Sequence, residues 1–97
     1  MWMMLQVHID AVDGSEALSS GEMQQAIGAF GERFKPEATY FTVDGGMRAA
    51  FFVFDMKDAN EMPAIAEKFF ALGAEVQLAP VMTAEDLRTG LAGAGLG

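Results

Sequence analysis

The stretch ATYFTVDGGMRAAFFVFDM, residues 38–56, decides the fold of this 97-residue chain. Two runs rich in β-branched and aromatic residues, 38–43 and 47–56, flank Asp44, Gly45 and Gly46. Asp-Gly and Gly-Gly pairs tolerate the positive φ of a tight hairpin turn, so the stretch predicts a β-hairpin. A two-residue turn pairs even-numbered residues of the first strand with odd-numbered residues of the second, and a three-residue turn would reverse this assignment.

Upstream of the hairpin, residues 2–10 alternate and predict a strand with one apolar face. Residues 11–20 are rich in Gly, Ser and Asp and are expected to form a loop. Apolar residues then recur at helical spacing from about Ser20 to Phe34. Ser19 or Ser20 is the expected N-cap, with Ser19 and Glu22 as a capping box, and the helix should end before Pro36.

Downstream, Asp58 and Glu61 fit a capping box for a second helix that has Pro63 in its first turn and ends near Gly73. A strand over 75–82 and a short terminal helix capped by Thr83 follow, and the tail 90–97 is expected to fray. The order β-α-β-β-α-β predicts one α+β domain over 1–97, ferredoxin-like, with a short C-terminal helix and with the first and third strands central.

Composition limits the function. Lys and Arg number 6 against 14 Asp and Glu, a net charge of −8, and this argues against nucleic-acid partners. No cysteine is present, which excludes thiolate chemistry. The apolar start lacks a basic region and is interrupted by Gln6, His8 and Asp10, so we expect a strand, neither a signal peptide nor a membrane segment, and a cytoplasmic protein. The 52% hydrophobic content predicts self-association.

Two helices can cover only one face of the sheet. With a two-residue turn, Phe52 and Phe54 face the helices, and the opposite face mixes large apolar groups with uncharged polar ones. That face is expected to carry Trp2, Met4, Gln6, His8, Tyr40, Thr42, Ala49, Phe51, Val53, Gln77, Ala79 and Val81. Such a surface suits a homodimer interface, a ligand cavity, or both.

Four segments carry a resemblance to a known family: residues 35–41, 48–55, 63–70 and 80–82. They resemble a family of small bacterial proteins in the dimeric α/β-barrel superfamily, over nearly the whole chain. The resemblance implies a ferredoxin-like fold and a sheet-to-sheet dimer, but no single activity, since the superfamily includes isomerases, monooxygenases, cyclases, haem enzymes and non-catalytic stress proteins. The family often has Lys where Gln6 stands and Tyr where Phe51 stands, which weakens a catalytic role at either position.

His8, the only histidine, is the candidate general base for proton abstraction from a carbon acid, with Tyr40 or Gln77 steadying the oxyanion. One His without Cys cannot fill a closed zinc site, so neither a metal nor a cofactor is expected. Candidate ligand-binding residues are Trp2, Met4, Gln6, Thr42, Phe51 and Gln77.

Two functions stay open. In the first, the dimer binds a small apolar molecule, aromatic or polyketide-like, between its sheets and acts as a cofactor-independent isomerase, cyclase or oxygenase. In the second, the sheets fill each other and the protein is a non-catalytic homodimeric interaction or stress-response module without ligand. Whether the protein is an enzyme is left undecided by the sequence.

Overall fold

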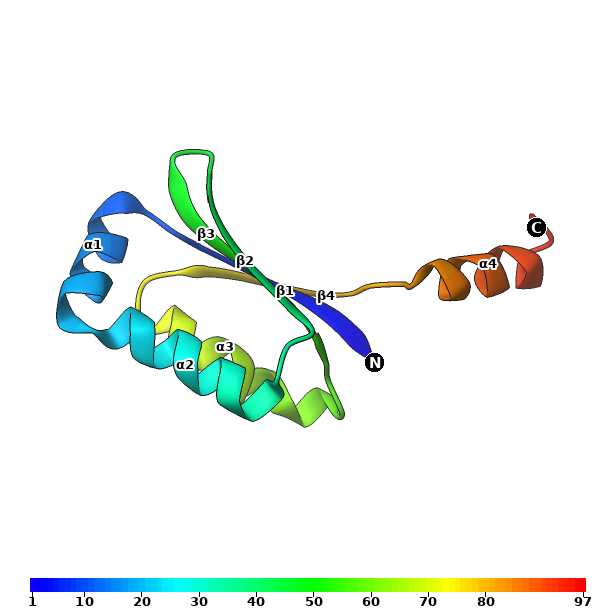
Figure 1. Ribbon diagram of the computed structural model, residues 1–97, viewed down its shortest axis with the longest axis horizontal. Coiled ribbons are helices and arrows are strands. Elements are labelled where there is room, and N and C mark those ends of the chain that lie inside the picture. The colour runs from blue at the N-terminus through cyan, green and yellow to red at the C-terminus, as the bar shows by residue number, and fades with distance from the viewer.

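The computed structural model describes all 97 residues, Met1–Gly97. It is an α+β fold with one four-stranded antiparallel sheet in the order β2-β3-β1-β4, so the predicted ferredoxin-like order and the central first and third strands are confirmed. Figure 1 shows the helices α1, α2 and α3 together on one side of this sheet. In chain order the elements are β1 (Trp2–Ile9), α1 (Ala11–Ser20), α2 (Glu22–Phe34), β2 (Ala38–Asp44), β3 (Met47–Asp55), the 3₁₀ turn η1 (Ala59–Glu61), α3 (Met62–Phe70), β4 (Glu75–Pro80) and α4 (Ala84–Gly93).

The hairpin has the two-residue turn. Asp44 pairs with Met47, and Gly45 and Gly46 have φ values of 60° and 79°, as a type I′ turn requires. The register therefore pairs even-numbered residues of β2 with odd-numbered residues of β3. Phe52 and Phe54, which are 1% and 0% exposed, face the helices, as predicted.

The core fills the space between the sheet and the helices. Alternate residues of β1 are buried, and they pack with the phenylalanines of β3 and with the apolar stripes of α2 and α3. Phe30 of α2 contacts Phe52 and Phe54 at ring-centroid distances of 4.8 and 5.1 Å. Burial of these large side chains supplies most of the free energy that holds the helices to the sheet.

The loop expected over 11–20 is wrong, because this segment forms helix α1. The Asp10 carboxylate accepts a hydrogen bond from the Asp13 backbone N–H at 2.7 Å and so caps the helix. Buried Gly14 and Ala17 dock α1 on the body of the protein. Tertiary packing thus outweighs the low helix propensity of the Gly and Ser residues that suggested a loop.

Helix α2 begins two residues later than expected. Gly21, at φ 82°, is both the C-cap of α1 and the N-cap of α2. The Ser19–Glu22 capping box does not form. Instead Ser20 Oγ accepts from the Glu22 N–H at 3.2 Å. The helix ends at Lys35, in the left-handed region at φ 47°, immediately before Pro36 as predicted.

The second half of the chain follows the prediction more closely. The Asp58–Glu61 capping box is present, and Pro63 lies in the first turn of α3. Gly73 has φ 84°, but the C-cap of α3 is Ala71, two residues before the glycine expected to end the helix. Strand β4 stops at Pro80 instead of residue 82, because the chain leaves the sheet there toward α4.

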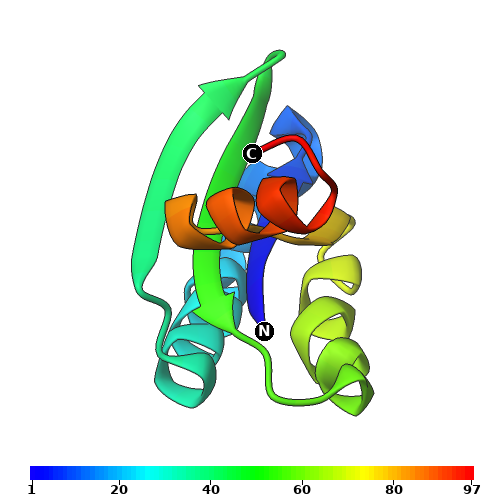
Figure 2. The ribbon, with the colours of Figure 1, turned by 90° about the vertical axis from the view of Figure 1, so that its right-hand side faces the viewer.

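The helices do not reach across the whole sheet. Strand β2 lies at one edge, and Figure 2 shows that its hairpin stands clear of the helix layer. Phe41 and Val43, on the helix side by parity, are consequently 59% and 76% exposed. The expectation that one face would be fully covered therefore fails at β2.

Helix α4 forms an arm. It is capped by a Thr83–Asp86 capping box, as Thr83 predicted, and it runs to Gly93, so the fraying expected over residues 90–97 is not seen at residues 90–93, which are helical. No residue of α4 is buried, and Figure 1 shows the helix extending away from the body at the end of β4. The arm gives the molecule its longest dimension of 52 Å. None of the helices is long and apolar enough to cross a membrane.

Candidate functional site

The outer face of the sheet, turned away from the helices, carries the residues that the sequence singled out. Gln6 pairs with Gln77 on one side and with Phe51 on the other. Tyr40 lies across from Phe51 and is 69% exposed. The predicted parity is thus confirmed for these four residues.

His8 finds a partner that the sequence analysis missed. Its Nε2 lies 2.9 Å from Asp44 Oδ2, at the turn end of β2, and the His8 side chain is 16% exposed against 62% for Asp44. The contact runs diagonally across β3, where His8 pairs with Ala49 and Asp44 pairs with Met47. The sequence could have indicated this contact, because the alternation of side chains places Asp44 on the same face as His8.

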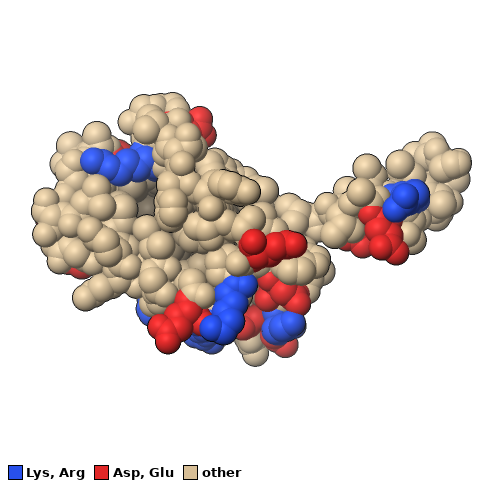
Figure 3. Space-filling model, viewed as in Figure 1, with Lys and Arg blue, Asp and Glu red and all other residues tan.

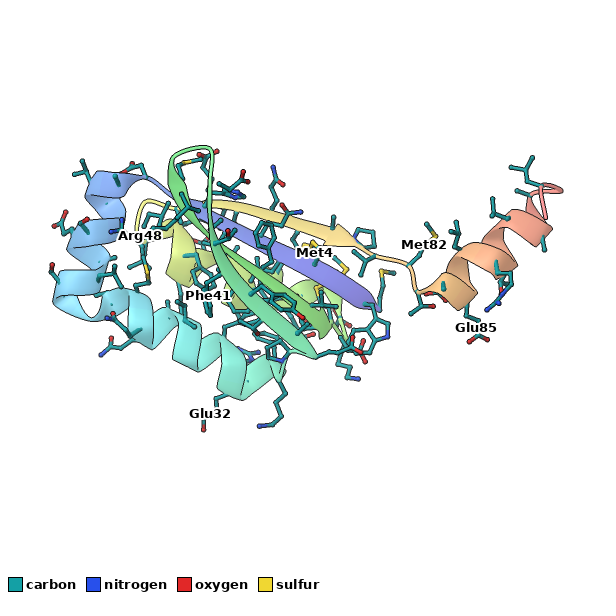
Figure 4. The ribbon with its side chains drawn as sticks, turned by 45° about the horizontal axis from the view of Figure 1, so that its top comes forward. Met4, Glu32, Phe41, Arg48, Met82 and Glu85 are labelled. Carbon is teal, nitrogen blue, oxygen red and sulfur yellow. The ribbon has the colours of Figure 1, made fainter.

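The structure brings together only part of the predicted site. A shallow depression of about 340 Å³ is lined by Gln6, His8, Asp44, Gly45, Met47, Glu75 and Gln77. Tyr40 is outside it, and neither Tyr40 nor Gln77 hydrogen-bonds to His8, whose partner is Asp44. Trp2 and Met4 lie at the opposite end of β1, so Figure 4 shows Met4 well removed from the hairpin turn. Thr42 and Phe51 lie on the same face, and Phe51 meets the His8 ring edge-on at 6.0 Å.

A second hollow lies on the helix side of the sheet. This inner cavity has a volume of about 200 Å³, and eleven of its thirteen lining residues are hydrophobic. They come from β1, β2, β3 and all three packed helices. The lining is Val7, Ile9, Leu18, Met23, Ile27, Phe41, Thr42, Arg48, Ala49, Ala50, Phe69, Leu72 and Ala74.

The inner cavity exists because β2 is not covered by helices. Phe41 lies on the exposed edge strand β2, and its ring packs edge-to-face against the core residue Phe52 at a ring-centroid distance of 6.2 Å. Leu18 and Phe41 are exposed and Arg48 is half-buried, so these three residues form the rim through which the cavity opens to solvent. The sequence analysis missed this site because it assumed a complete helix layer.

Arg48 is the one charged residue of the inner cavity. It extends from β3 toward α1, as Figure 4 shows, and donates from Nη1 to the Ala11 carbonyl and from Nη2 to Ser15 Oγ, each at 3.2 Å. Neither acceptor is charged, and no carboxylate lies within ion-pair distance of the guanidinium. Strand alternation would have placed Arg48 on the helix side from the sequence, because Arg48 pairs there with buried Ile9.

Charged groups are otherwise sparse around both sites. In the view of Figure 3 most of the visible Asp, Glu, Lys and Arg side chains gather along the lower edge and on the arm, and the middle of this face is uncharged.

At the start of α1, backbone hydrogen bonding from Asp13 lowers the pKa of Asp10, and the neighbouring Asp10 carboxylate raises the pKa of Asp13. Nowhere do three His, Cys, Asp or Glu side chains converge as metal ligands.

Comparison with models of protein families and with curated proteins found no match to this sequence. Function must therefore be argued from the geometry of the two sites.

Proposed function

We propose that the protein binds a small apolar molecule in the inner cavity and that two copies associate through the outer face of the sheet. The observation that carries the first part is an apolar cavity of about 200 Å³ that opens to solvent between the hairpin and the helices. An apolar cavity of roughly 150 Å³ is enough to hold benzene. The inner cavity therefore suits a molecule of one ring or a short alkyl chain.

The lining favours binding over acid–base catalysis within the inner cavity. It contains no His, Asp, Glu, Tyr or Ser. Thr42 belongs to the outer face of β2, which leaves Arg48 as the only polar side chain on the helix side of the lining. A proton-transfer reaction needs a general base within hydrogen-bond reach of the substrate, and His8 lies on the other face of the sheet. Apolar contact supplies affinity here, and the single cation supplies orientation.

Filling the inner cavity tests the proposal. Ala50 is a buried lining residue, and Ala50→Leu places three more carbons in the space. Toluene should show saturation-transfer signals with the parent protein and weak or no signals with Ala50→Leu. The matched control is Ala79→Leu, which adds the same group on the exposed outer face. Absence of toluene binding to the parent, or equal binding to both variants, would overturn the inner cavity as a binding site.

Association through the outer face is supported by its composition. Trp2, Met4, Phe51 and Val53 are only half-buried there, and Tyr40 is exposed. A sheet face in contact with water is ordinarily polar, so a second copy is the simplest cover for this one.

A ligand between two such sheets is the second candidate, and the His8–Asp44 pair favours it. A carboxylate that accepts from one ring nitrogen fixes the tautomer and leaves the other nitrogen free for a substrate. Isomerase, cyclase or oxygenase chemistry would belong to this outer site, and the ligand-free interaction module is the outcome if neither site binds.

A further inference from the structure

We infer that the molecule bound in the inner cavity is a carboxylate, held at the cavity rim by Arg48. This inference rests on the proposed binding function and names the chemical class of its ligand: an aryl or short-chain alkyl carboxylic acid. Three features of Arg48 support this inference: its unused hydrogen-bond donors, its position beside α1 and its charge.

The guanidinium has donors to spare. Arginine presents five N–H groups, and the structure uses two of them, both toward neutral oxygens of α1. Asp55 takes two cationic partners, Lys57 and the terminal ammonium, yet no carboxylate approaches Arg48. A half-buried cation beside an apolar cavity stabilises an anion more strongly than an exposed one does, because the surroundings screen its charge less.

A glycine in α1 leaves space for the side chain of Arg48, which extends from β3. Gly14 lies in the middle of the helix, where a glycine costs about 1 kcal/mol relative to alanine. A Cβ at Gly14 would lie 2.7 Å from Arg48 Nη1 and 3.3 Å from Arg48 Cδ. The absent side chain therefore leaves space for the guanidinium in its present position beside α1. Ile9, which lines the inner cavity, is the other neighbour of that position, at 3.2 Å.

Size and charge agree on the ligand class. A benzoate-sized molecule fills a cavity of about 200 Å³ with its ring and leaves its carboxylate at the rim. The net charge of −8 repels anions from the protein as a whole. A preference for an anion over its neutral isostere must therefore arise from a local cation, and Arg48 is the only one in the lining.

The test compares benzoate with benzamide by calorimetric titration of the full chain, and hexanoate with hexanamide in the same way. Benzoate and hexanoate should bind at least about tenfold more tightly than the corresponding amides, because a charge-assisted fork to arginine exceeds a neutral hydrogen bond. Arg48→Gln should abolish the preference, and Arg48→Lys should keep part of it. Circular dichroism establishes that each variant is folded.

A second variant leaves the arginine in place. Gly14→Ala improves helix propensity but displaces the guanidinium, so the acid preference should shrink without loss of helix. Equal affinity of acid and amide for the parent, or a preference that survives Arg48→Gln, overturns the carboxylate inference and leaves the binding function intact. Failure of all four probes while toluene still binds also overturns the carboxylate inference, and failure of toluene as well overturns the binding function itself.

Discussion

At the scale of single residues, each face of the sheet carries one partly buried polar residue of a different kind. Arg48 lies on the helix side next to an apolar space, and His8 lies on the outer side in contact with Asp44. Each is partly withdrawn from water, where a polar group costs free energy unless it is paired. The pairing differs, since His8 has a carboxylate and Arg48 has only neutral acceptors.

His8→Asn distinguishes the two candidate sites. Asparagine keeps a hydrogen-bonding group but removes the ring that reaches Asp44 and meets Phe51. We expect the variant to fold, to lose no more than about 1 kcal/mol of unfolding free energy, and to bind toluene and benzoate in the inner cavity as the parent does. Titrations with both probes check this. Loss of their binding in His8→Asn would place the ligand on the outer face.

Asp55 gives a prediction on acid stability. Hydrogen bonds from Lys57 and from the terminal ammonium lower its pKa from the ordinary 3.8 to about 2. A carboxyl whose pKa is depressed by folding stabilises the native state above its unfolded value, and the contribution disappears as pH falls through the folded value. Asp55→Asn should therefore lower the urea midpoint at neutral pH, and its difference from the parent should vanish by about pH 2. A difference that is constant across this range would contradict the assignment.

At the scale of elements, the chain contains two similar capping boxes with different surroundings. Asp58 and Glu61 cap the turn that leads into α3, whose Ile65 and Phe69 are buried against the sheet. Thr83 and Asp86 cap α4, which buries nothing. The same local signal therefore acts on an element of the core in one case and on a free arm in the other.

This difference predicts unequal effects of removing the two caps. Asp58→Ala should lower the global free energy of unfolding by about 1 kcal/mol, because α3 cannot unfold without losing its core contacts. Thr83→Ala should leave global unfolding unchanged and reduce only the helical signal of α4, since a ten-residue helix is marginal by itself. Urea denaturation followed by tryptophan fluorescence from Trp2 and by circular dichroism separates the two. Equal destabilisation by both variants would mean that α4 packs on the body.

At the scale of the whole molecule, apolar surface is left in two places that one chain cannot cover. The first is the outer face of the sheet with the exposed hairpin residues Tyr40, Phe41 and Val43. The second is the arm, where Met82, Leu87 and Leu91 are exposed and the two leucines are four residues apart on one side of α4. Association of two copies would bury both.

We expect a homodimer in sedimentation at micromolar concentration. Val53→Asp should dissociate it without unfolding the monomer, because the carboxylate would be buried without a partner in the interface but stays hydrated in the single chain. Glu32→Asp, at an exposed position of α2, is the control that leaves the sheet face unchanged. A parent protein that sediments as a monomer would refute the interface.

The arm provides a separate prediction on the same assembly. Leu87→Asp together with Leu91→Asp should leave the unfolding of the monomer unchanged, because no residue of α4 is buried and the helix extends away from the body within one chain. The double variant should nevertheless weaken dimerisation if the arm lies against the second copy. Sedimentation and denaturation at a common protein concentration measure both effects. Destabilisation of the monomer by this change would show that α4 folds back on its own chain.

The sequence by itself determined the elements with strong local signals. The Asp44-Gly45-Gly46 motif predicted the hairpin but left a two-residue and a three-residue turn open. The structure has the two-residue turn, and this register assigns each residue of β2 and β3 to its face, because side chains alternate along a strand. Of the two predicted capping boxes, the one at Asp58 formed, and the predicted Thr83 cap formed as well, for the equally local reason that a side chain satisfies its own helix end.

Tertiary structure alone decided the rest. Helix α1 forms against its local propensity because Gly14 and Ala17 are buried on the body. The inner cavity depends on how far the helices reach across the sheet, and the His8–Asp44 contact joins β1 to β2 across the intervening strand β3. These features follow from distances between segments remote in sequence, and neither periodicity nor capping contains such distances.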